Sequence, residues 1–148
     1  TGLLNRRGFE AAVAAAQARD GAHQRTAGVL AIDLDGFKPI NDTHGHAEGD
    51  EALRAVGRLL AEVVRGVDHA GRLGGDEFVL YLADLQRPED LSRVVERLER
   101  VLDAHNASAA RGGRPYRIGW SVGAAVREGG EPLAATLARA DAALYREK

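Results

Sequence analysis

The stretch Arg72-Leu-Gly-Gly-Asp-Glu-Phe-Val-Leu-Tyr-Leu82 concentrates backbone freedom and negative charge more tightly than any other part of the chain. Two adjacent glycines precede two adjacent carboxylates, and an apolar run follows them. A Gly-Gly pair is typical of a tight turn between antiparallel strands. We therefore predict strands over 68–73 and 78–82, joined by a hairpin turn at Gly74 and Gly75, whose neighbouring acids face a metal and a phosphate.

The rest of the chain predicts a frame for that hairpin. Apolar spacing and helix-start signals predict four helices, two over 6–18 and 48–65 and two that begin at Pro88 and at Pro132. They also predict strands over 28–35 and 116–126. Residues 37–43 are expected to form a short turn or helical piece, and residues 106–115 a loop. After the first helix this order is β, α, β, β, α, β, with a further helix at the end. That is the split βαβ, ferredoxin-like arrangement, an α+β fold with a mostly antiparallel sheet flanked by helices and with extra N- and C-terminal helices.

This arrangement has a consequence for the acidic residues. The first strand of such a sheet lies beside the third strand and antiparallel to it. The end of the first strand therefore meets the start of the third. We expect Asp33 to lie beside Asp76 and Glu77, although the sequence separates them widely.

Composition limits the function classes. The chain has 148 residues, 45% hydrophobic and 28% charged, with no cysteine and a net charge of −2; this fits one globular domain. The charge balance argues against a nucleic-acid partner, because a protein that binds nucleic acid usually needs a basic face.

No apolar run reaches the roughly 18 residues of a membrane span, and no signal peptide is visible, so we expect a cytoplasmic domain without direct membrane contact. Both ends interrupt helix signals, so we expect residues 1–148 to be one domain of a longer protein with sensor or other domains.

Clustered carboxylates suit Mg²⁺ or Mn²⁺, which prefer oxygen ligands and are completed by water and substrate phosphates. A pair of such ions stabilises the attacking and the leaving oxygen of an in-line displacement at phosphorus. Alternatively, Asp33 and Asp35 merely end a strand and the Gly74–Glu77 segment is an exposed turn. That simpler interpretation is preferred for a single acidic residue at a strand end. The expected approach of Asp33 to Asp76 and Glu77 favours the metal site.

Gly74-Gly75-Asp76-Glu77-Phe78 matches the signature of the GGDEF family, the diguanylate cyclases. The resemblance extends over essentially the whole chain. The other blocks that resemble the family are Thr1–Phe9, Asp33–Asp42, Gly45-His46, Gly49-Asp50 and Ala140–Tyr145 followed by Lys148. The resemblance implies a palm-type nucleotidyl cyclase fold. One departure is that the glycine and arginine that usually follow the final lysine in the family are absent here.

The resemblance implies that two GTP molecules condense into cyclic di-GMP with release of two pyrophosphates. Each subunit would bind one GTP, and two copies would face each other, so a homodimer is needed. Asp33, Asp76 and the Leu34 carbonyl resemble the metal ligands, with Glu77 as a further candidate, for Mg²⁺ or Mn²⁺, two ions per half-site. Asp76 or Glu77 would help to deprotonate the attacking 3′-hydroxyl, directly or through a metal-bound water; the sequence does not separate the two roles.

Substrate contacts follow from the same resemblance. Asn41 and Asp50 resemble the residues with which the family recognises guanine. Their amide and carboxylate groups also complement the edges of guanine. The alternative for each residue is helix capping. Lys38 would meet phosphate charge, or is a solvated surface lysine. The remaining candidates are His46 at the nucleotide pocket, for which packing in a loop is the alternative, Lys148 on the triphosphate, and Gly74 and Gly75 at the close approach of ligand to backbone.

Arg65-Gly-Val-Asp68 resembles the product-inhibition site of the family, an Arg-x-x-Asp placed just before the signature. Arginine can hold phosphate or the Hoogsteen edge of guanine in bidentate fashion, and Asp68 would accept from the N1/N2 edge. The alternative is a surface ion pair at a helix end, which contributes little.

Three other functions compete with an active cyclase. One is a GTP-binding regulatory module without turnover, which the intact signature disfavours. Another is a cyclic di-GMP receptor acting only through Arg65 and Asp68. The third is another palm-like nucleotide cyclase or polymerase, which would share the acidic edge but not the other sequence blocks.

Overall fold

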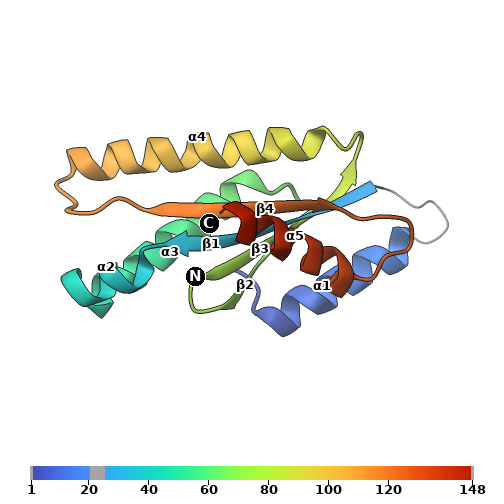
Figure 1. Cartoon of the computed structure of the whole chain (residues 1–148), viewed down its shortest axis with the longest axis horizontal. Helices are drawn as coiled ribbons and strands as arrows, with labels where there is room; N and C mark the ends of the chain where they lie inside the picture. The colour runs from blue at the N-terminus through green and yellow to red at the C-terminus, as the bar shows by residue number, and fades with distance from the viewer. Residues whose placement is uncertain (1, 21–25, 148) are drawn as a thin grey trace.

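The computed structural model describes residues 2–20 and 26–147 (Figure 1). Its elements, in chain order, are α1 (Arg6–Asp20), β1 (Thr26–Asp35), α2 (Phe37–His44), α3 (His46–Val63), β2 (His69–Gly74), β3 (Glu77–Leu85), α4 (Asp90–Arg111), β4 (Gly119–Val126) and α5 (Leu133–Glu147). The predicted α+β class and the predicted element order are confirmed. In this described part of the chain, no helix is long and apolar enough to cross a membrane.

The four strands form one antiparallel sheet in the order β2-β3-β1-β4. This is the ferredoxin-like order, with β1 between β3 and β4. The first strand therefore lies beside the third, as predicted. The N-terminal segment extends the sheet edge through an isolated parallel bridge between Leu4 and Gly71.

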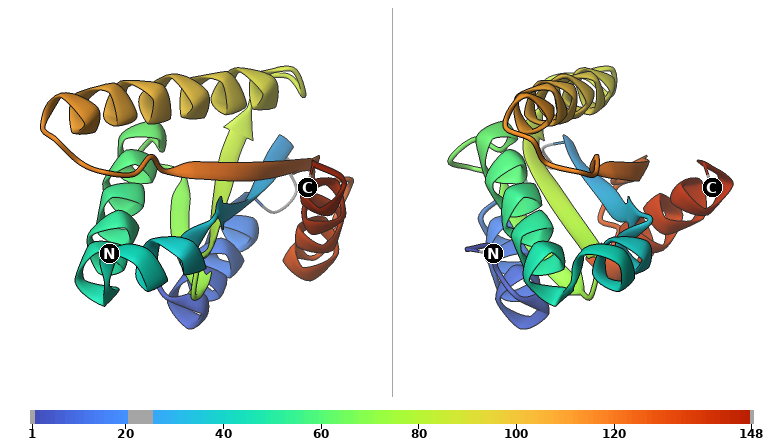
Figure 2. Two further views of the ribbon diagram at one scale, coloured as in Figure 1. Left: turned by 60° about the vertical axis from the view of Figure 1, so that its left-hand side comes forward. Right: turned by 90° about the vertical axis from the view of Figure 1, so that its left-hand side faces the viewer.

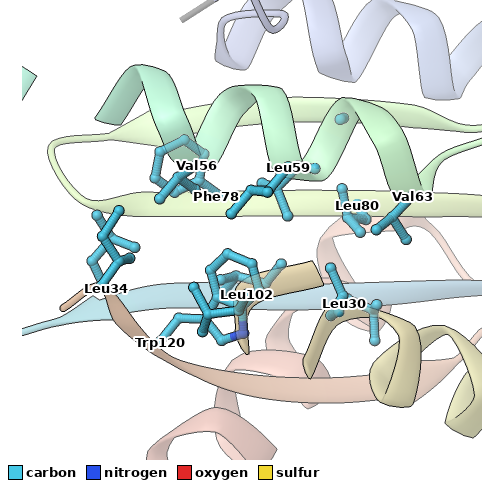
Figure 3. Packing of buried hydrophobic residues seen from close by; sticks show 14 of the residues in the cluster. Leu30, Leu34, Val56, Leu59, Val63, Phe78, Leu80, Leu102 and Trp120 are labelled. Atoms are coloured by element: carbon cyan, nitrogen blue, oxygen red, sulfur yellow. The ribbon is translucent and has the colours of Figure 1, made fainter. Parts of the chain in front are cut away.

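Helices cover both faces of the sheet. In two views at right angles, α4 lies on one side and α1 on the other (Figures 1 and 2). Alternate strand residues supply the two cores, as the period of two in a strand requires. Leu30, Leu34 and Phe78 pack with α3 and α4 in one cluster, and Figure 3 shows Phe78 beside Val56 of α3. The opposite face packs against α1 and α5 through the residues Val29, Ala31, Val79, Tyr81 and Ala125.

The predicted loop over 106–115 is wrong at its start, because α4 continues to Arg111. Asn106 lies inside the helix and is buried. Its amide donates to the Ile118 carbonyl at 2.8 Å and accepts from the Ile118 N–H at 2.9 Å. This partner satisfies a side chain that otherwise favours turns, and the helix ends later, near Gly113 at φ 86°. Because the backbone N–H and C=O of Ile118 are both hydrogen-bonded to the Asn106 side chain, β4 begins at Gly119 rather than at residue 116.

Candidate active site

The ends of β1 and β3 bring the predicted acids together. Asp33 pairs directly with Glu77 in the antiparallel ladder. The Leu34 N–H donates to the Asp76 carbonyl oxygen at 3.1 Å, which ties the end of β1 to the hairpin turn. Asp33 and Asp76 are half-buried, and Glu77 is exposed. The expectation that these acids meet at one sheet edge is therefore confirmed.

The turn itself differs from the prediction by one residue. Gly74 pairs with Glu77, so the two-residue loop is Gly75 and Asp76 rather than the two glycines. Neither glycine has a positive φ, so the turn does not depend on a left-handed backbone. A Cβ at Gly74 or Gly75 would meet no atom within 4 Å, which leaves open space beside the backbone for a ligand.

Arg72 braces this turn from β2. Its Nε and Nη2 atoms donate to the Gly75 carbonyl oxygen at 3.0 and 2.6 Å. Two charge-assisted bonds to one acceptor hold the loop more firmly than a neutral bond would. The loop that carries Asp76 is thus fixed on one side by Arg72 and on the other by Leu34.

The donors at this edge fit a hard divalent cation. The Asp33 and Asp76 carboxylates and the Leu34 carbonyl are oxygen ligands of the kind that Mg²⁺ prefers. A strand residue directs its N–H and C=O toward the same neighbour, so the Leu34 carbonyl faces the turn and not β4. Within residues 2–20 and 26–147, no group of three or more histidine, aspartate or glutamate side chains is arranged to hold a metal ion. A cation here would therefore need backbone, water or phosphate oxygens to complete its shell.

Asn41 and Asp50, the residues predicted to contact guanine, lie on neighbouring helices. Asn41 is on α2 and half-buried, and Asp50 is in the first turns of α3 and exposed. The Asn41 amide rests against Gly49, where a Cβ would coincide with Oδ1 and lie 2.7 Å from Cγ. Gly49 is therefore the residue that lets this amide occupy its place.

Two further predicted contacts are exposed. Lys38 donates from Nζ to Asp42 Oδ2 at 2.7 Å, one turn along α2, with 84% of its side chain accessible. His46 begins α3 and is exposed, which contradicts the alternative of packing in a loop. Lys148 lies outside the described residues.

Arg65 and Asp68 form a different arrangement from a surface ion pair. The Asp68 side chain is only 2% exposed. Its Oδ2 accepts from the backbone N–H and the Nε of Arg65 at 2.9 and 3.3 Å, and its Oδ1 accepts from the Ala83 N–H at 3.0 Å. Arg65 also donates from Nη2 to the Ala83 carbonyl oxygen at 2.8 Å. The pair thus clamps the end of α3 to β3, beside Asp84, a non-glycine residue at φ 57°.

A cavity of about 300 Å³ adjoins this clamp. Arg93 and Arg97, one turn apart on α4, line it together with Arg65 and Asp68. Sequence reasoning missed both α4 arginines, because a helix with many charged residues does not reveal which of them face a neighbouring element. The only available signal was their spacing of four residues, which places them on the same helix face.

The topology and the acidic sheet edge define an α+β domain of the palm type. The chain matches the family described as Diguanylate cyclase, GGDEF domain, over residues 1–148, and it belongs to that family.

Named relatives and solved structures agree with this. The chain is 38% identical over 152 residues to Diguanylate cyclase DosC of Escherichia coli, covering all of this chain and 32% of the relative. Among solved structures, diguanylate cyclase SiaD from Pseudomonas aeruginosa, in complex with its activator SiaC, matches with a TM-score of 0.86 and 36% identity, over 99% of this chain and 55% of that one. The GGDEF domain of DgcB from Caulobacter crescentus, in complex with c-di-GMP, matches with a TM-score of 0.83 and 32% identity, over 99% and 85%. The chain spans only 18% and 32% of the length of two of its curated relatives.

Proposed function

We propose that this domain condenses two GTP molecules into cyclic di-GMP, releasing two pyrophosphates. The observation that carries the proposal is the pairing of Asp33 with Glu77, with the Asp76 turn tied to Leu34. This pairing brings oxygen donors of two distant segments to one edge of the sheet, and one of these segments is the intact Gly74–Phe78 signature.

The proposed residue roles are those that the resemblance to the family implies. Asp33, Asp76 and the Leu34 carbonyl would hold the metal, Mg²⁺ or Mn²⁺ with two ions per half-site, and Glu77 would be a further ligand. When bound, such ions supply charge stabilisation at the reacting phosphate. Asp76 or Glu77 takes part in removing the proton of the attacking 3′-hydroxyl.

The substrate contacts are also part of the proposal. Asn41 and Asp50 read guanine, because their amide and carboxylate groups complement its donors and acceptors. Lys38 leaves Asp42 to meet phosphate charge, His46 borders the nucleotide, and Lys148 contacts the triphosphate. Gly74 and Gly75 leave the space in which the α-phosphate approaches the turn.

The reaction requires a second copy of the domain. One active edge holds one nucleotide, and the attack needs a second nucleotide that faces it, so two subunits meet with their edges opposed. Sensor or other domains of the whole protein would control this encounter.

We also propose inhibition by the product at the clamp. Arg65, Arg93 and Arg97 are among the residues that line a cavity of about 300 Å³, and arginine side chains can bind the phosphates and the Hoogsteen edges of cyclic di-GMP. The inward-facing Asp68 carboxylate holds Arg65 in place, and reading a guanine edge would require it to turn outward.

Incubation with GTP and Mg²⁺ at high protein concentration, with chromatographic identification of the product, tests the proposal. We expect cyclic di-GMP from the wild type and none from Asp76→Ala. If an artificially dimerised variant bound GTP without consuming it, the domain would be a regulatory module and the proposal would be wrong.

A further inference from the structure

Tyr116 connects the segment before β4 to the corner between α2 and α3. Its hydroxyl lies 2.9 Å from Glu48 Oε2 and 3.1 Å from the Glu48 carbonyl oxygen. It accepts from Arg114 Nη1 at 2.9 Å, and the same Nη1 lies 3.4 Å from Glu48 Oε2. One hydroxyl group thus gathers a backbone oxygen, a carboxylate and a guanidinium from segments 68 residues apart.

The ring of Tyr116 contacts the other side of the same corner. Its centroid lies 5.2 Å from that of His44, at the end of α2. The Arg114 guanidinium carbon lies 5.6 Å from the Tyr116 ring centroid, within cation–π range. Burial, and next the hydrogen bond to Glu48, raise the pKa of Tyr116 above its ordinary value of 10.0. A single side chain therefore holds the last residue of α2 and the first turn of α3.

Asn41 and Asp50, the proposed guanine contacts, lie immediately next to these contacts. Glu48, whose carbonyl and carboxylate meet Tyr116, precedes Gly49 and Asp50 in sequence. Gly49 is in turn the surface on which the Asn41 amide rests. A displacement of Glu48 would therefore move Asp50 directly and would move the support of Asn41.

We propose that Tyr116 is a positioning residue that sets the preference for guanine by fixing the corner between Asn41 and Asp50. This inference rests on the proposed GTP-dependent function and names the device that gives it base selectivity. Tyr116 acts through Glu48 and Gly49. Arg114 supports it by holding the hydroxyl and the Glu48 carboxylate in one orientation.

The test is Tyr116→Phe, which removes only the hydroxyl and keeps the ring against His44. Equilibrium titrations with GTP and with ATP, in the presence of Mg²⁺, measure base selectivity directly. We expect the Kd for GTP to rise by about fivefold to tenfold, the loss expected for a hydrogen-bonded contact, while the Kd for ATP stays unchanged. In steady-state assays, KM for GTP should rise while kcat at saturating GTP is retained, because the acidic edge is untouched.

Tyr145→Phe is the matched control, since it removes the same atom from a tyrosine that is 82% exposed on α5; its Kd values and KM should equal those of the wild type. If Tyr116→Phe binds GTP as tightly as the wild type, or loses affinity for GTP and ATP alike, the inference is overturned and the proposed function stands. If the wild type itself does not prefer GTP to ATP, the proposed function and the inference both fail.

Discussion

Replacing Gly49 with alanine should separate base recognition from stability. The added methyl would coincide with Oδ1 of Asn41, so the amide must leave its position. In α3 alanine is favoured over glycine by about 1 kcal/mol, which offsets a rotamer cost of about 0.5–1.5 kcal/mol for Asn41. We therefore expect the melting temperature to change by less than about 4 °C.

Binding of GTP should respond much more strongly to the same change. Losing one amide contact with guanine costs about 1 kcal/mol, or roughly a fivefold rise in the Kd for GTP. The assay is a double-mutant cycle with Gly49→Ala, Asn41→Ala and the double variant, titrated with GTP. If Gly49 acts through Asn41, Gly49→Ala causes no further loss once Asn41 is alanine. Equal losses in both backgrounds, or no loss at all, would show that Gly49 does not support guanine binding through Asn41.

Three further predictions concern α5, the ion pair between Arg139 and Glu131, and the clamp formed by Arg65 and Asp68. Gly123→Ala should lower the melting temperature by about 6–12 °C, because the added Cβ would lie 2.7 Å from Leu144 Cα in the α5 backbone, at a cost of about 3 kcal/mol. Gly119→Ala on the same strand is the control, because its Cβ would make only ordinary contacts. Equal melting temperatures of the two variants would contradict this prediction. Hydrogen bonds from Arg139 hold the pKa of Glu131 at about 2, below its usual 4.5, so thermal melts should show the advantage of the wild type over Glu131→Gln at neutral pH shrinking as the pH falls from about 4.5 toward 2; an advantage that persists at pH 2 would be inconsistent with the lowered pKa. Arg65→Ala should relieve inhibition by added cyclic di-GMP while initial turnover stays near normal, and unchanged inhibition would show that the clamp is not the inhibitory site.

The parts of the site that follow from chain topology could be predicted from the sequence. The ferredoxin-like order alone requires the end of β1 to meet the start of β3, so the approach of Asp33 to Glu77 needed no side-chain detail. The same holds for the two cores, because strand residues alternate between faces.

What could not be predicted depends on tertiary partners. Asn106 reads as a loop residue until Ile118 is placed beside it, and only then does α4 extend to Arg111. The sequence of an Arg-x-x-Asp segment does not reveal whether its carboxylate faces solvent or, as the Asp68 carboxylate does, the interior. Likewise, nothing near Tyr116 in the sequence indicates that it reaches Glu48.

We propose that residues from β1 and from the β2–β3 hairpin form one metal-dependent phosphoryl-transfer site. The most direct test is the initial rate of cyclic di-GMP formation from GTP and Mg²⁺ by Asp33→Asn, with Asp103→Asn on the exposed side of α4 as a charge-matched control. We expect Asp33→Asn to lower the rate by about a hundredfold or more, roughly 3 kcal/mol of transition-state stabilisation, while Asp103→Asn retains the wild-type rate. Full activity in Asp33→Asn would contradict this proposal.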